Sequence, residues 1–131
     1  MGPRKILLVD PNADCRELLL LYLNLLNYPT PIQANNGEEA LSKALTERPD
    51  LIIMEVVLPE RDGFQIVAHL RANPSTRNTL ILAATAMALS CDREKCLAGG
   101  FDGYLAKPFT LWELNNLLRA FFSTNSNRNR P

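Results

Sequence analysis

Pro49-Asp50-Leu51-Ile52-Ile53-Met54-Glu55 is the part of this sequence that says most about its fold. Four consecutive apolar residues, Leu51–Met54, stand between a Pro-Asp pair and an acid. A short run that is apolar throughout is typical of a parallel strand covered on both faces, because a strand with one wet face alternates apolar and polar residues. The segment therefore predicts a central strand whose carboxyl end carries the carboxylate of Glu55.

Comparable apolar runs recur on both sides of this strand and alternate with longer amphipathic segments. The predicted strands are Ile6–Val9, Pro31–Ala34, Leu51–Met54, Leu80–Ala84 and Tyr104–Ala106. The predicted helices are Asp14–Leu26, Glu38–Thr46, Phe64–Ala72, Asp92–Ala98 and Leu111–Phe122. Such alternation predicts an α/β fold, a doubly wound sheet of five parallel strands with five helices, since right-handed crossovers place helices on both faces. Asn36 and Thr110, each three residues before a glutamate, are expected to cap two of these helices.

The composition is that of one globular domain. The chain has 131 residues, 47% of them apolar, and its 14 basic side chains balance 14 acidic ones, so no general attraction to nucleic acid or an anionic membrane is expected. The first apolar run is too short for a signal peptide or a spanning helix. Cys15, Cys91 and Cys96 match no disulfide or zinc spacing and are expected to be reduced fillers. We expect a cytoplasmic protein with a domain over 1–122 and a disordered polar tail over 123–131.

Polar side chains stand where four of the predicted strands end. Asp10 follows the first strand, Glu55 the third, Thr85 the fourth and Lys107-Pro108 the fifth. Ligands of such sheets bind in a crevice at the carboxyl ends of the strands, so we expect these side chains to meet. Carboxylates suit a divalent cation, whereas a hydroxyl and an ammonium suit the oxygens of a phosphoryl group. The alternative is that they are independent polar residues at the starts of loops.

The sequence also resembles a response-regulator receiver domain from Lys5 to about Phe122. The matching segments are Ile6-Leu-Leu-Val-Asp10, Asn36-Gly-Glu-Glu-Ala40, Pro49-Asp-Leu-Ile-Ile-Met54, Leu58-Pro59 with Asp62-Gly63, Ala84-Thr-Ala86, and Tyr104-Leu-Ala-Lys-Pro-Phe109 with Glu113-Leu114. The resemblance implies a flavodoxin-like sheet with strand order 2-1-3-4-5.

The resemblance also implies a chemistry for the strand ends. In the family, a kinase phosphohistidine donates its phosphoryl group to an aspartate after the third strand, aided by Mg²⁺ held by acids after the first. By resemblance, Thr85, Tyr104, Lys107 and Pro108 would form the switch. Thr85 and Lys107 would contact the phosphoryl oxygens, and Tyr104 would swing inward.

Two departures from the family pattern affect this chemistry. The phosphoacceptor aspartate falls on Glu55, and Pro11 stands where the second metal-binding acid belongs. The candidate metal ligands are then Asp10, Glu55 and the carbonyl of Val57, a set expected to bind Mg²⁺ weakly or not at all. Glutamate is one methylene longer than aspartate, so its carboxylate is expected to be misplaced for in-line transfer and to reach Lys107 and Thr85 directly.

The favoured interpretation is a stand-alone receiver-like protein that signals through a binding surface and is not an enzyme. Because Glu55 imitates part of an acyl phosphate, the protein would be phosphorylation-independent or constitutively active-like. Three alternatives stay open. Phosphoacceptance could persist at Glu55 or elsewhere, Glu55 could merely pair with Lys107 in a structural relic, or the fold could bind a small ligand as flavodoxins do. Against the last, Pro11-Asn-Ala-Asp14 lacks a Gly/Ser/Thr-rich phosphate loop.

The expected partners are a histidine kinase, a phosphotransfer protein or another signalling protein, with a homodimer as an open alternative. On the first helix, Leu20 and Leu21 are expected to be exposed and to contact such a partner, whereas Leu18 is placed on the buried face. By resemblance, the fourth helix, fifth strand and fifth helix form the usual output face, and Trp112 and Tyr104 are the candidates there. His69 has no second histidine to pair with and is expected to be solvated or partly packed.

Overall fold

The computed structural model describes residues 2–86 and 92–128, with side chains described as far as Phe122. Within these residues five strands form one parallel sheet in the order β2-β1-β3-β4-β5, so the predicted fold is confirmed. The strands are β1 (Ile6–Val9), β2 (Ile32–Ala34), β3 (Leu51–Met54), β4 (Leu80–Thr85) and β5 (Gly103–Ala106). The helices are α1 (Ala13–Leu25), α2 (Gly37–Glu47), α3 (Gly63–Ala72), α4 (Asp92–Ala98) and α5 (Leu111–Arg128).

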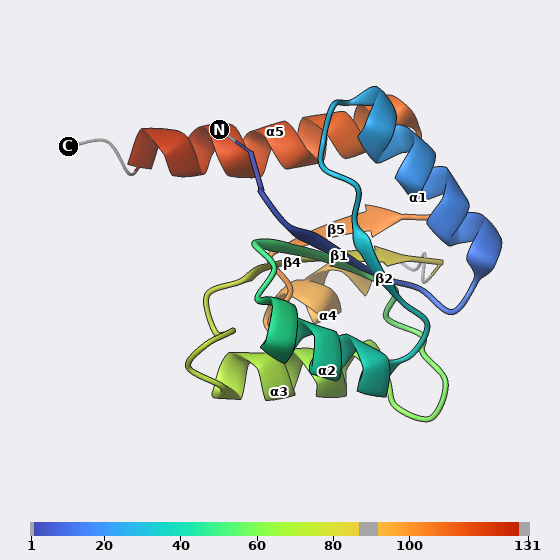
Figure 1. The fold of residues 1–131 in the computed structure, drawn as a ribbon, viewed down its shortest axis with the longest axis vertical. Coiled ribbons are helices and arrows are strands. Elements are labelled where there is room, and N and C mark those ends of the chain that lie inside the picture. The colour runs from blue at the N-terminus through green and yellow to red at the C-terminus, as the bar shows by residue number, and fades with distance from the viewer. Residues whose placement is uncertain (1, 87–91, 129–131) are drawn as a thin grey trace.

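The sheet separates two groups of helices: α1 and α5 lie on one face, and α2, α3 and α4 on the other (Figure 1). Along β1, Ile6 and Leu8 pack with residues of α1 and α5. Leu7 and Val9 pack with residues of α2 and α3. Both faces of the central strands are therefore dry, which is why all four residues of β1 and of β3 are apolar and buried. Each buried leucine or isoleucine stabilises the fold by about 1.5–3 kcal/mol.

The predicted element ends lie within one residue of those in the structure, except at the end of α5. β4 continues to Thr85, one residue beyond the predicted end, and α5 continues to Arg128 instead of Phe122. Residues 111–130 contain no glycine or proline, the two strongest helix breakers, so the helix can continue beyond Phe122. The division into a domain over 1–122 and a disordered tail stays a prediction. The structure differs from it in that α5 extends into the predicted tail. Among the described residues, no helix is both long and apolar enough to cross a bilayer.

Side chains cap α2 and α5 at Asn36 and Thr110, where the sequence predicts them. Thr110 and Glu113 form a reciprocal pair, in which the Glu113 N–H donates to Thr110 Oγ1 at 3.1 Å and the Thr110 N–H donates to Glu113 Oε1 at 2.9 Å. At α2, the Glu39 N–H donates to Asn36 Oδ1 at 2.8 Å as expected, but the carboxylate of Glu39 accepts from the N–H of Asn35. The side chain of Glu39 was predicted to accept from the N–H of Asn36, and it accepts instead from the N–H of the preceding residue.

Candidate functional site

Four polar side chains converge at the carboxyl edge of the sheet. The register pairs Val9 with Met54 and Met54 with Ala83, so the residues that follow β1 and β3 lie side by side. Asp10, Glu55 and Thr85 are buried, with exposed fractions of 2%, 6% and 0%. Lys107 follows β5 and reaches the same place, and its peptide bond to Pro108 is cis. Asp10, Glu55 and Lys107, with Thr85 beside them, form the cleft, and the alternative of independent loop residues is wrong for these positions.

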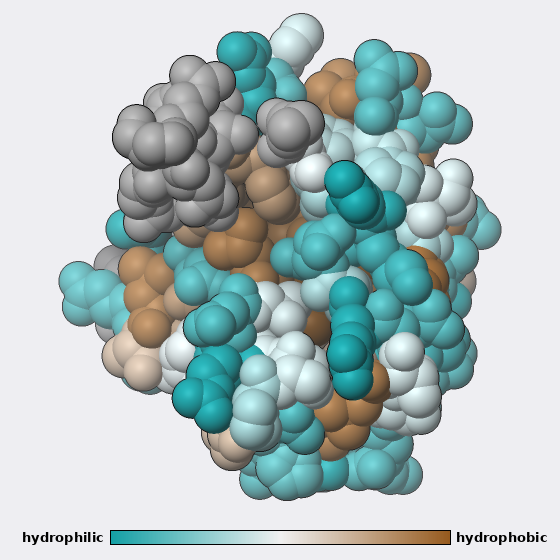
Figure 2. Space-filling view, turned by 60° about the vertical axis from the view of Figure 1, so that its left-hand side comes forward, coloured by the Kyte–Doolittle hydropathy of each residue, from teal (hydrophilic) through white to brown (hydrophobic). Residues whose placement is uncertain are grey.

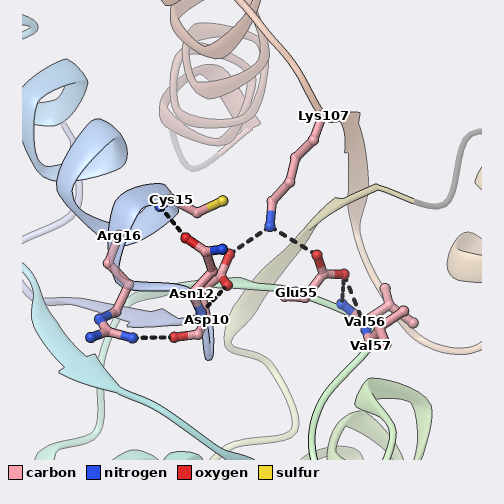
Figure 3. Close-up of polar contacts among 8 residues, drawn as sticks. All are labelled: Asp10, Asn12, Cys15, Arg16, Glu55, Val56, Val57 and Lys107. Atoms are coloured by element: carbon pink, nitrogen blue, oxygen red, sulfur yellow. Dashed lines mark hydrogen bonds and ion pairs between the residues drawn. The ribbon is translucent and has the colours of Figure 1, made fainter.

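Lys107 bridges the two carboxylates (Figure 3). Its Nζ donates to Asp10 Oδ2 at 2.6 Å and to Glu55 Oε1 at 2.8 Å. The other oxygens are also occupied: Glu55 Oε2 accepts from the N–H groups of Val56 and Val57 at 2.7 and 3.0 Å, and Asp10 Oδ1 accepts from the Asn12 N–H at 2.9 Å. Each carboxylate oxygen in the cleft therefore has a donor, as buried charges require.

Burial and hydrogen bonding act in opposite directions on the charges of the cleft. Burial by itself raises the pKa of Glu55, but hydrogen bonds from Lys107, Thr85 and the Val57 N–H, with the positive charge of Lys107, bring that pKa below its ordinary 4.5. Burial lowers the pKa of Lys107, whereas its bonds to Asp10 and Glu55 raise it above 10.5. Glu55 and Lys107 are thus both charged at neutral pH.

The sequence did not predict two neighbours of Asp10, both drawn in Figure 3. Asn12 caps α1, and its side chain accepts from the Cys15 N–H at 3.0 Å. Arg16 donates from Nη1 to the Asp10 carbonyl at 2.6 Å and from Nε to Gln33 Oε1 at 3.2 Å. The N-cap rule could have found Asn12. No sequence signal points to Arg16, because its partners are a backbone carbonyl and a residue on another strand.

Tyr104 lies on β5 close to the cleft. It is half-buried and packs against the apolar layer on the α2 and α3 side of the sheet. Burial raises the pKa of its phenol, and the electrostatic effect of Asp92, Cys96 and Glu55 raises it further. The Tyr104 phenol is therefore protonated at neutral pH.

The sequence profile of the "Response regulator receiver domain" family matches residues 6–119. This chain belongs to that family. Among solved receiver structures, one from a Pseudomonas aeruginosa sensor histidine kinase, with magnesium in its active-site cleft, has a TM-score of 0.81, is 37% identical and covers 92% of this chain and 97% of that one. The chemotaxis response regulator CheY4 of Vibrio cholerae also has a TM-score of 0.81, at 32% identity, over 92% of this chain and 98% of that one.

Curated relatives of this receiver domain differ in length. The polar-differentiation response regulator DivK of Brucella anthropi is 33% identical over 109 residues, which cover 83% of this chain and 88% of DivK. The alkaline phosphatase synthesis transcriptional regulatory protein PhoP of Bacillus subtilis is 39% identical over 117 residues, 89% of this chain and 48% of PhoP. This receiver domain thus spans about half the length of several transcriptional regulators that it matches.

The donor set of the cleft does not match what Mg²⁺ requires. Magnesium takes octahedral oxygen ligands at about 2.0–2.1 Å. In this receiver domain the oxygens of Asp10 and Glu55 are directed at the ammonium of Lys107 and at N–H groups, and Pro11 adds no carboxylate. Among the described residues, no group of three or more His, Cys, Asp or Glu side chains could hold a metal ion.

The structure corrects the predicted exposure of α1. Leu21 is 52% exposed as predicted, but Leu20 is half-buried against the core and Leu18 is 41% exposed. The reason is that α1 packs through Leu19 and Leu23, four residues apart, which rotates the buried stripe away from the predicted one. Leu18 and Leu19 border an apolar cavity of about 290 Å³ between α1 and the residues after β5.

The remaining predicted residues lie mostly as expected. Trp112 is 68% exposed on α5 and His69 is exposed on α3. Cys96 is buried and Cys15 half-buried, whereas Cys91 lies outside the described residues. The predicted partner-binding role of Leu21, Tyr104 and Trp112 stays a prediction.

Proposed function

We propose that this receiver domain signals by protein contact without being phosphorylated, with Glu55 standing at the phosphoacceptor position. The observation that supports this most is the bridge from Lys107 to Glu55 and Asp10, at 2.8 and 2.6 Å. The carboxylate of Glu55 accepts a hydrogen bond from Lys107, the residue that would otherwise contact a phosphoryl group. Its charge is present without a kinase, because its pKa lies below 4.5.

Both oxygens of Glu55 are poorly available as nucleophiles. Oε1 accepts from the Lys107 ammonium, and Oε2 accepts from two backbone N–H groups. Attack on a phosphorus atom would require at least one of these oxygens to leave its donors and line up with the leaving group, and misplacement by about 1 Å can slow such a step a hundredfold. Glu55 would therefore be a stable imitation of the charged state and a poor acceptor.

Weak Mg²⁺ binding is part of the same proposal. The ammonium of Lys107 lies between the two carboxylates that would have to serve as ligands, and a cation entering there meets its positive charge at close range. Asp10, Glu55 and the carbonyl of Val57 stay the candidate ligands. No step of the proposed function depends on the metal.

The output would be contact with a histidine kinase, a phosphotransfer protein or another signalling protein. Leu21 with the neighbouring Leu18 on α1, and Trp112 on α5, are exposed apolar side chains of the kind found at interfaces. A role as a stand-alone protein in the cytoplasm, without a nucleic-acid partner, stays a prediction, and so does a homodimer.

Incubation with acetyl phosphate and Mg²⁺, followed by intact mass measurement, tests the proposal. The unmodified protein should show no adduct, and Glu55→Asp alone should show little, because Pro11 still supplies no carboxylate. Glu55→Asp combined with Pro11→Asp should show a labile phosphoryl adduct, since both missing carboxylates are restored. A stoichiometric adduct on the unmodified chain would contradict the proposal.

A further inference from the structure

A second hollow lies at the opposite edge of the sheet, where the strands begin. This N-edge cavity of about 570 Å³ is lined by Gly2–Arg4, Asn27–Pro29, Arg119 and Phe122. The lining comes from three separate parts of the chain: the segment before β1, the turn between α1 and β2, and the later half of α5. The volume lies within the range of about 300–1,000 Å³ that is common for small-molecule sites. Figure 2, turned toward the edge where the strands begin, shows apolar patches set among polar side chains.

Two guanidinium groups border this cavity, and neither has an acidic partner among the described residues. Arg4 and Arg119 are exposed, and no ion pair joins either to an acid of that part of the chain. The neighbouring Lys5, by contrast, pairs with Glu47 at 3.3 Å. The carboxylate of Asp50 accepts from the backbone N–H groups of Arg4 and Lys5 at 2.8 and 3.1 Å and does not line the cavity. The guanidinium groups of Arg4 and Arg119 are therefore free of acidic partners among the described residues and available to an anionic ligand.

Aromatic rings form the apolar part of the lining. Tyr28 and Phe122 are both half-buried and pack against the core layer beneath α1 and α5. The backbone of Tyr28 is held by a 2.9 Å bond from its N–H to the Leu23 carbonyl. Tyr28 and Arg119 both line the N-edge cavity, so this ring and this guanidinium face the same space. Rigid aromatic rings beside arginines suit a flat anionic molecule.

We propose that the N-edge cavity binds a small aromatic oxyanion of the size of a nucleoside monophosphate. Arg4 and Arg119 would hold the oxyanion, because guanidinium forks match phosphate and carboxylate oxygens. Tyr28 and Phe122 would contact the aromatic ring. A cavity of about 570 Å³ is much larger than a phosphate ion, so a ligand that fills it must carry more than the anionic group. The site is independent of Glu55 and Lys107 and of the proposed signalling function.

Calorimetric titration of the full chain with adenosine monophosphate, inorganic phosphate and adenosine tests the proposal. The monophosphate should bind saturably at concentrations up to about 1 mM and more tightly than either fragment. Arg119→Gln and Arg4→Gln should each weaken binding about tenfold or more, since each removes a charge-assisted hydrogen bond. Arg93→Gln, a matched loss of one exposed cation on α4, should leave binding unchanged.

Three outcomes of the titrations would contradict the proposed site. Absence of saturable binding to the unmodified protein excludes a nucleotide-sized ligand. Equal affinity for phosphate and the monophosphate reduces the cavity to an adventitious ion site. Equal weakening by Arg93→Gln indicates diffuse charge attraction. Thermal unfolding of each variant in ligand-free buffer shows whether it is folded.

Discussion

Lys107 holds together a cleft in which every other charged group is an acid. Its ammonium is surrounded by Asp10 and Glu55, both nearly inaccessible to solvent, and its own side chain is 15% exposed. A buried ion pair of this kind contributes little beyond an apolar replacement as long as it is complete. Removal of one member is different, because the remaining charges keep their burial and lose their partner.

Lys107→Met should be strongly destabilising. The substitution leaves Asp10 and Glu55 facing one another without a cation, and loss of one partner of a buried pair typically lowers the free energy of unfolding by about 3–5 kcal/mol. Lys5→Met is the matched control, because the Lys5–Glu47 pair is exposed and such pairs contribute about 0–1 kcal/mol. Urea unfolding of both variants gives the comparison. Equal effects of the two substitutions would contradict the burial argument.

The contribution of Glu55 to stability should depend on pH in the acid range. Its pKa is lower in the folded protein than its ordinary 4.5, so the unfolded chain binds the proton more readily. The free energy of unfolding therefore includes a contribution from Glu55 that is complete above pH 4.5 and declines as pH falls through the lowered pKa.

Unfolding curves of the unmodified protein and of Glu55→Gln, recorded over the acid range, measure this contribution as a difference. The difference should shrink as pH falls, and Glu47→Gln should show no comparable trend. Lys107 has the opposite sign: its pKa is raised, so its contribution is lost only when pH rises beyond 10.5. A difference that stays constant in acid would show that Glu55 is not held ionised by the fold.

Arg71 joins elements that are distant in sequence at the edge where the strands begin. From α3 it donates to the carbonyls of Gly100 and Thr79 and to the carboxylate of Asp102, with distances of 2.7–3.1 Å. The same carboxylate accepts from the Ile81 N–H at 2.9 Å. One guanidinium thus ties α3 to the starts of β4 and β5, which position Thr85 and Lys107 at their other ends.

Arg71→Lys should lower the free energy of unfolding by about 1–3 kcal/mol. A lysine keeps the charge but cannot serve the same set of acceptors with a planar fork, so at least one partly buried carbonyl loses its donor. Arg93→Lys on α4, where the side chain is exposed, should change stability by less than about 0.5 kcal/mol. Thermal or urea unfolding measures both, and an unchanged Arg71→Lys variant would show that the network is dispensable.

Taken as a whole, the molecule combines the sheet of a receiver domain with a cleft closed by its own side chains. The two groups of helices bury both faces of the sheet and leave the strand ends as the places where polar groups can gather. At one edge those groups are satisfied by one another, through Asp10, Glu55 and Lys107. A ligand that needs them must first displace Lys107.

The stability of the whole domain should consequently be insensitive to Mg²⁺. A cation that binds the folded state raises the melting temperature by mass action, so weak binding leaves it unchanged. We expect a shift below about 1 °C at about 10 mM Mg²⁺ for the unmodified protein, and a clear rise for Glu55→Asp combined with Pro11→Asp. Melting temperatures measured by calorimetry in Na⁺ solutions of the same ionic strength show how much of any shift comes from the screening of charges by salt. A large Mg²⁺ shift of the unmodified protein would contradict the closed cleft.

The order of elements and the members of the cleft could be read from the amino-acid sequence. Apolar runs such as Leu51–Met54 mark buried strands, and the residues that follow them must meet because parallel strands end at one edge. The same reasoning placed Glu55 next to Lys107. These features depend on local pattern and on the topology that the pattern imposes, and both are written along the chain.

Other features came from packing between segments that are far apart in the sequence. The rotation of α1 that half-buries Leu20 and exposes Leu18 depends on how the helix meets the sheet. The bond from Arg16 to the Asp10 carbonyl and the three segments that enclose the N-edge cavity depend on the path of the folded chain. The spacing of apolar residues locates the buried stripe of a helix only to within a residue or two. Contacts between side chains and backbone can be known only from three-dimensional positions. The physical reason is that such contacts are chosen by the energy of the assembled structure and not by any single element.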